Sequence, residues 1–236
     1  MKKAAILLFF ISIAAFSFSQ ISASEHYQNA LINDSEKDYT AALRDLDNAL
    51  LQRPNFDSAY CLRGLIYFKT GEYKNALKQF DLALKLNPAY EEALNGRGIV
   101  KAQQREYPAA IKDFSKIIAL QPTHVKPYYN RAQAKARLDD FESAILDLDK
   151  AIELDADYVN AYYSRAFWKD MSGDHKGAIA DYEKVISLDG SYKEAYIGMA
   201  TCYYEQNQKE KACEVLNAAT AKGSTIAEQL IEELCK

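Results

Sequence analysis

Histidine, cysteine and aspartate are the residues of this sequence whose side chains most often do chemistry. Its histidines, His26, His124 and His175, lie far apart and belong to no HExxH or CxxC pattern. The sequence also lacks a glycine-rich phosphate loop and the GxSxG motif of many hydrolases. Because no catalytic or metal-binding motif is present, the sequence predicts a non-catalytic protein with no metal and no cofactor.

The aspartates form a regular column along the chain. Asp113, Asp147 and Asp181 follow one another at intervals of 34 residues, Asp45 falls in the same column, and Gln79 interrupts it. An arginine column has the same period and contains Arg63, Arg97, Arg131 and Arg165. Regularly spaced acids and arginines on packed helices form structural ion pairs far more often than a catalytic row. We therefore expect a ladder of ion pairs, and whether each arginine pairs within its own unit or with the preceding unit stays open.

The composition is that of a foldable globular protein. The chain has 236 residues, of which 49% are hydrophobic and 26% charged. Lysine and arginine total 29 against 33 acidic residues, for a net charge of −4, and the two signs are interleaved. Binding to phosphate backbones needs a concentrated basic face. The charge pattern therefore disfavours a nucleic-acid partner.

The N-terminal residues form a separate unit with the pattern of a secretory signal peptide. Lys2 and Lys3 precede an apolar run over residues 4–18, and small residues follow in "SFSQISAS". This pattern predicts a signal peptide over residues 1–19, with cleavage before Gln20 or as late as residue 23. A retained membrane anchor is the alternative, but a spanning helix wants about 20 apolar residues. We expect an exported protein, periplasmic or secreted, with no membrane insertion after cleavage.

The interval of 34 residues runs through most of the remaining chain. Small residues recur at Ala42, Ala76, Ala110, Ala144, Ala178 and Ala212, with larger apolar residues four positions later and further residues, mostly small, three beyond. Spacings of three and four place residues on one face of a helix. Each unit therefore reads as two helices, over residues 58–69 and 73–86 in the clearest copy. Gly71 and Gly173 mark the turn between them, and prolines at 54, 88 and 122 mark the ends of units.

These columns together resemble the tetratricopeptide repeat. The resemblance covers six units, at residues 23–56, 57–90, 91–124, 125–158, 159–192 and 193–226. It implies an all-α fold, a right-handed α-solenoid of six helix-turn-helix units. The tail at residues 224–236 carries an apolar stripe of Ile226, Leu230, Ile231 and Leu234, which predicts a C-terminal capping helix.

The cysteines are unevenly placed, with Cys61 alone and the other three in the last quarter of the chain. If the tail folds back at residues 223–224 as an antiparallel neighbour, Cys213 and Cys235 reach the same level and can form a disulfide. Cys202 lies at a similar level, so the connectivity stays open. Three buried free thiols are the alternative.

In the family that the sequence resembles, the first helices line a concave groove that binds extended peptides or partner segments. Carried onto this chain, the groove positions are Asn95, Ile99, Lys126, Tyr129, Asn130, Gln133, Arg137, Asn160, Tyr163, Phe167, Asp170, Glu194, Thr201 and Tyr204. Aromatic rings and amides with few charges suit peptide binding. The cationic residues that some family members use to hold chaperone tails are missing at the corresponding positions.

Two functions fit this surface. The first is a non-catalytic scaffold or adaptor of the cell envelope that binds a protein or peptide in the groove. The alternative is an accessory protein that binds polysaccharide or peptidoglycan through exposed aromatic rings, for which Trp168 is a candidate. The identity of the partner and the oligomeric state are not encoded in these patterns.

Overall fold

The computed structural model describes residues 21–235, and within this range every regular element is an α-helix. The predicted signal peptide, residues 1–19, lies outside the described residues. The helices are α1 (Ala23–Ser35), α2 (Tyr39–Gln52), α3 (Asp57–Lys69), α4 (Tyr73–Leu86), α5 (Glu91–Gln103), α6 (Tyr107–Leu120), α7 (Val125–Ala136), α8 (Phe141–Leu154), α9 (Val159–Met171), α10 (His175–Leu188), α11 (Lys193–Glu205), α12 (Lys209–Ala221) and α13 (Thr225–Leu234). The all-α solenoid fold predicted from the sequence is confirmed.

The second helix of the fourth unit, α8, shows how the repeat pattern produces a helix of fixed length. Asp140 precedes it and accepts a hydrogen bond from the backbone N–H of Ser143 at 3.2 Å, which satisfies one free donor of the first turn. Its small and apolar residues Ala144, Leu148 and Ala151 are fully buried on one face. This stripe packs against α7, so burial of the repeat columns stabilises the helix pair.

The turn between the two helices of a unit places one residue in the left-handed backbone region in all six units. These residues are Lys37, Gly71, Arg105, Asp139, Gly173 and Asn207, with φ between 58° and 86°. The sequence marks this turn with glycine in two units only. The backbone holds the same shape elsewhere because two hydrogen bonds close the helix end, as where Arg105 N–H donates to Ala102 and Glu106 N–H donates to Lys101.

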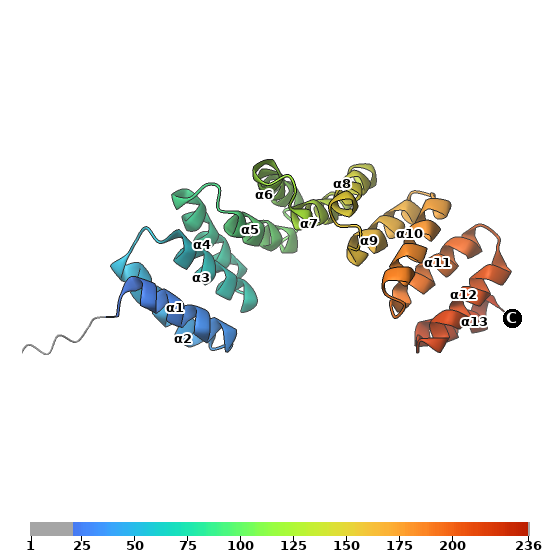
Figure 1. Cartoon of the computed structure of the whole chain (residues 1–236), viewed down its shortest axis with the longest axis horizontal. Coiled ribbons are helices and arrows are strands. Elements are labelled where there is room, and N and C mark those ends of the chain that lie inside the picture. Colours follow the sequence, from blue (N-terminus) through green and yellow to red (C-terminus); the bar gives the residue numbers. More distant parts are fainter. Residues whose placement is uncertain (1–20, 236) are drawn as a thin grey trace, which may run out of the picture.

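The units stack into an open arch with the ends of the described chain far apart (Figure 1). Each helix packs against the next along the chain, and first helices also contact the first helix of the following unit, as α3 does α5 and α5 does α7. Accordingly α3, α5, α7 and α9 lie on the inner side of the arch, and α4, α6 and α8 lie on its outer rim (Figure 1).

Glycines on the first helices make room for large rings. A Cβ added at Gly98 would lie 2.7 Å from Cε1 of Phe114, and one at Gly64 would lie 2.7 Å from Cε1 of Phe80. Gly96 in the next unit faces the same Phe80 ring from the other side. The two rings are almost fully buried, so the glycines allow the inner helices to close over a packed core.

The C-terminal helix α13 covers the last repeat as predicted, but with a different set of residues. Leu230, Ile231 and Leu234 pack against the core of α11 and α12, and Ala227 is fully buried. Ile226 was expected in this stripe, yet it is 56% exposed, because the face of α13 that packs on the last repeat contains its neighbour Ala227 instead. Among residues 21–235 no helix is long and apolar enough to cross a membrane.

Candidate functional site

The arginine and aspartate columns form a ladder of ion pairs that fixes the first helices in place. Arg97 donates through Nε and Nη2 to both carboxylate oxygens of Asp113, at 2.9 and 2.6 Å, and through Nη1 to Asp81 at 2.7 Å. Arg165 repeats this arrangement with Asp181 and Asp149. The question left open by the sequence is answered: each of these two arginines pairs with its own unit and with the preceding one.

The ladder has additional ion pairs in the third, fourth and fifth units, where a lysine also contacts the aspartate. Lys101 adds a contact to Asp113 at 2.9 Å, and equivalent lysines contact the next two aspartates of the column. Burial opposes the charge of Arg97, but its hydrogen bonds to the carboxylates of Asp113 and Asp81 hold its pKa above the usual value. The ladder therefore stays charged and aligns the inner helices.

At the N-terminal end the ladder changes its composition. Asp45 contacts His26 Nδ1 at 3.2 Å and accepts a hydrogen bond from Asn33 at 2.9 Å, with no arginine in the pair. In the second unit Arg63 donates to Gln79 at 2.9 Å and to Asp47 at 2.6 Å. The aspartates of the column therefore serve packing, as the sequence predicted.

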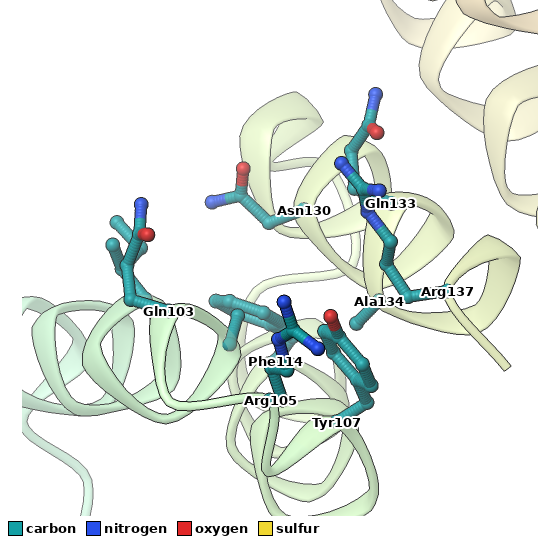
Figure 2. A pocket seen from close by; sticks show the side chains of 10 residues that line it. Gln103, Arg105, Tyr107, Phe114, Asn130, Gln133, Ala134 and Arg137 are labelled. Atoms are coloured by element: carbon teal, nitrogen blue, oxygen red, sulfur yellow. The ribbon is translucent and has the colours of Figure 1, made fainter.

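Hollows lie between the first helices of neighbouring units in the described part of the chain. The first, of about 470 Å³, lies between α5, the start of α6 and α7. Its lining residues are Ile99, Ala102, Gln103, Arg105, Tyr107, Phe114, Asn130, Gln133, Ala134 and Arg137. Figure 2 shows Gln103 on one side of this hollow and Gln133 and Arg137 on the other, with Arg105 and Tyr107 between them.

The second hollow, of about 560 Å³, continues from the first toward α9. It is lined by Tyr129, Gln133, Ala136, Arg137, Phe141, Asn160, Tyr163, Ser164, Phe167, Trp168 and Tyr192. Because Gln133 and Arg137 line both hollows, the two form one continuous surface over the third, fourth and fifth units. Trp168 is only 6% exposed, so it offers no open ring face to a sugar.

The third hollow, of about 400 Å³, lies between the start of α5 and the start of α7 and contains two more of the predicted positions. Asn95 and Lys126 line it with Tyr90, Glu91, Glu92, His124 and Pro127. Tyr204, on α11, is 43% exposed and lies outside all three hollows. Of the fourteen groove positions expected from the sequence, Asp170, Glu194, Thr201 and Tyr204 therefore line none of these hollows, and ten line one or two of them: Asn95, Ile99, Lys126, Tyr129, Asn130, Gln133, Arg137, Asn160, Tyr163 and Phe167.

Two of the predicted amides already bridge neighbouring units. Asn130 donates to the Asn95 side chain at 3.1 Å, and Gln133 donates to the Ser164 hydroxyl at 3.0 Å. An amide has two N–H donors and one carbonyl acceptor, so both side chains keep groups for a further partner. Their orientation is fixed by these bonds, which lowers the entropy cost of binding.

Tyrosines of the inner surface pack in pairs that join the first helix of a unit to the last residue of the same unit. The rings of Tyr129 and Tyr158 lie 5.3 Å apart, and those of Tyr163 and Tyr192 lie 4.9 Å apart. Burial raises the pKa of Tyr163, with a smaller effect from Glu194, and burial also raises the pKa of Tyr158 and Tyr192. These phenols therefore stay neutral at neutral pH and present rigid aromatic surface.

The residues that the sequence analysis missed come from the segments before and after the first helices. Tyr90 and Tyr192 occupy the position just before a first helix, and Arg105 is the left-handed turn residue of its unit. The groove positions expected from the sequence all belong to the first helices. The tyrosine column that precedes these helices was the available signal.

The cysteines of the last quarter are arranged as the fold-back predicts. Cys213 and Cys235 form a disulfide that ties the end of α13 to α12. Cys61 and Cys202 are free and buried. The alternative of three buried free thiols does not apply.

Comparison with known proteins identifies the class to which this arch belongs. Four models, each described as a tetratricopeptide repeat, match residues 58–90, 76–125, 125–158 and 171–226. The chain belongs to the tetratricopeptide repeat family. Among curated protein sequences no relative matches significantly.

Solved structures share the same architecture. The crystal structure of MamA is 26% identical, with a TM-score of 0.67, and the match covers 75% of this chain and 94% of that one. YrrB, described as a TPR protein with an unusual peptide-binding site, is 20% identical with a TM-score of 0.69 over 80% and 98%. PilW, a type IV pilus biogenesis factor, is 19% identical with a TM-score of 0.75 over 89% and 98%. The last two likenesses concern the fold alone.

Proposed function

We propose that this protein is an exported, non-catalytic adaptor that binds an extended segment of a partner protein along the inner side of the arch. The observation that carries the proposal is the continuity of the first and second hollows, which share Gln133 and Arg137. A surface of this length over three units fits a peptide better than a compact small molecule. YrrB, which has the same fold, is described as having a peptide-binding site.

The lining indicates the chemistry of the segment. Oriented amides such as Asn130 and Gln133 can bond a peptide backbone, and the rings of Tyr129 and Tyr163 can cover its side chains. Within residues 21–235, neither Arg105 nor Arg137 has an ion-pair partner. A carboxylate of the bound segment would supply one in the first hollow. We expect a segment with an acidic residue at that point.

The export part of the proposal rests on two features. The N-terminal pattern over residues 1–19 is that of a signal peptide. The Cys213–Cys235 disulfide is of the kind that persists in oxidising compartments outside the cytoplasm. A cell-envelope location agrees with both.

The proposal can be tested with peptides selected by the protein itself. Residues 20–236 are immobilised and used to select binders from a displayed peptide library, and affinities are then measured by fluorescence anisotropy. A Tyr129→Ala, Asn130→Ala, Tyr163→Ala variant should bind the selected peptides at least about tenfold more weakly, because central contacts carry most of the binding energy. Folding of the variant is checked by circular dichroism.

A variant of the outer rim serves as the matched control. Leu146 is 63% exposed on α8 and lines none of the hollows, so Leu146→Ala should leave affinity unchanged. Equal binding by the triple variant and the wild type would move the site off the inner surface. If no peptide is selected but cell-wall glycans bind and a Phe167→Ala variant loses them, the polysaccharide alternative holds, since Phe167 is 46% exposed in the second hollow.

A further inference from the structure

A cluster of three side chains lies at the junction of the fifth and sixth units. Asp170 comes from the end of α9, His175 is the first residue of α10, and Cys202 comes from α11. Their ligand atoms all lie within 4.8 Å of one another. These residues form no metal-binding motif in the sequence, because Asp170 and Cys202 are 32 positions apart and come together only when neighbouring units stack.

The carboxylate of Asp170 is the centre of the cluster. Its Oδ1 lies 2.7 Å from Nδ1 of His175 and accepts a hydrogen bond from the Cys202 thiol at 3.2 Å. Asp170 and His175 are 18% and 29% exposed, whereas Cys202 is fully buried. The sulfur of Cys202 therefore lies in the core, and the cluster reaches solvent on the side of the His175 imidazole.

Thiolate, imidazole and carboxylate are the three ligand types that zinc uses in proteins. Metal-ligand distances of about 2.0 to 2.3 Å place the donors of a tetrahedral zinc ion about 3.5 Å apart. The distances of 2.7 and 3.2 Å from Asp170 Oδ1 to the other two ligand atoms, and the limit of 4.8 Å for all three, are close to that spacing. The solvent-facing side leaves room for a water molecule as the fourth ligand.

Two other places in the chain show that the combination is distinctive. His26 and Asp45 also form a pair, at 3.2 Å, but this pair belongs to no such group of three. Cys61 is the other free buried thiol, and it belongs to none either. Within residues 21–235, Asp170, His175 and Cys202 are the one group of three such ligands found within this spacing.

We propose that Asp170, His175 and Cys202 form a zinc site that ties the fifth unit to the sixth. On binding, the Cys202 thiol gives its proton to solvent and its sulfur bonds to the ion, while the imidazole and the carboxylate replace their mutual contact with bonds to the metal. The site fixes the relative orientation of α9, α10 and α11. Together with the Cys213–Cys235 disulfide it locks the C-terminal end of the arch.

Metal binding is measured on residues 20–236 without a histidine tag, after treatment with EDTA. Calorimetric titration with Zn²⁺ should show one equivalent bound, and the melting temperature should rise on addition of Zn²⁺. Titration with Co²⁺ should produce the charge-transfer absorption of a cobalt–thiolate bond. That band distinguishes the site from carboxylates and imidazoles on the surface.

Matched variants identify the ligands. Cys202→Ser should abolish the cobalt–thiolate band, and it should weaken zinc binding by about tenfold or more, as should His175→Gln. Cys61→Ser removes the other buried thiol and should change neither result. His175→Gln alters a partly exposed side chain at a helix start, so it tests the site even if Cys202→Ser fails to fold.

The outcomes separate the proposal from a purely structural cluster. An absent cobalt–thiolate band in the wild type, or equal zinc affinity in wild type and His175→Gln, would mean that the three side chains only satisfy one another's hydrogen bonds. Loss of the band in Cys61→Ser would place the thiolate ligand elsewhere and overturn the assignment.

Discussion

At the scale of residues, an acidic and a basic position of the ion-pair ladder change together from one unit to another. Asp113 is paired with both Arg97 and Lys101, and its side chain is 4% exposed. In the second unit the same two columns hold Gln79 and Tyr67, so an acid and a base are missing together. Each unit thus keeps its buried charges paired.

Removing the acid alone should therefore be costly. We expect Asp113→Gln to lower the free energy of unfolding by about 3 kcal/mol, because two cations lose a buried partner. The double variant Asp113→Gln, Lys101→Tyr copies the second unit and should recover part of this loss. Urea unfolding of the wild type, both single variants and the double variant gives the coupling energy. Additive effects would show that the two positions act independently.

At the scale of elements, the turn between paired helices is set by the hydrogen bonds that close the first helix. Lys37 and Gly71 occupy the same place in successive units, with φ of 64° and 81°. A side chain in this region strains the backbone, whereas glycine does not. The four units without glycine keep the turn because the same two backbone hydrogen bonds close the end of the first helix in each of them.

Substitutions at this position should change the free energy of unfolding in opposite directions in the first and second units. Gly71→Ala should lower the free energy of unfolding by about 1 kcal/mol, and Lys37→Gly should raise it by about 0.5 kcal/mol, since relief of strain outweighs the added freedom of the unfolded chain. Glu36→Gly is the control for glycine itself: Glu36 has a φ of −82°, so the exchange should only destabilise. Chemical denaturation measures all three. A stabilising Glu36→Gly would refute this account of the turn.

At the scale of the whole molecule, the arch is a nearly one-dimensional assembly. Units contact their neighbours along the chain, so the middle units are held from both sides and the end units from one. The C-terminal end carries α13 and the disulfide of Cys213 and Cys235, whereas within residues 21–235 no further helix covers α1. Stability should therefore differ between the two ends.

Hydrogen exchange should reveal this gradient. We expect amide protection to be highest in α5 to α8, lower in α11 to α13 and lowest in α1 and α2, because local opening starts where fewest contacts must break. Reducing the disulfide should speed exchange in α12 and α13 and leave α5 to α8 unchanged. Mass-spectrometric exchange with and without reductant tests both statements. Uniform protection along the chain would indicate a single cooperative unit instead.

Much of this protein follows from the sequence because its contacts are local and repeated. Columns such as Ala144 and Leu148 report one helix face directly, and the 34-residue period fixes which helices are neighbours. The positions of the inner surface came from the resemblance to the repeat family, whose groove positions were carried onto this chain. Counting along two helices from a fold-back at residues 223–224 brought Cys235 to the level of Cys213, but it left Cys202 as a possible partner, and the structure forms the Cys213–Cys235 disulfide.

Tertiary structure alone decided the features that depend on how units stack. The turn residue Arg105 and the pre-helix residue Tyr192 reach the hollows because neighbouring units bring loop ends next to helix faces. The cluster of Asp170, His175 and Cys202 spans two units and has no spacing motif. Periodicity determines the helix faces, but the closeness of residues in different columns depends on the angle and offset between units, which only packing sets.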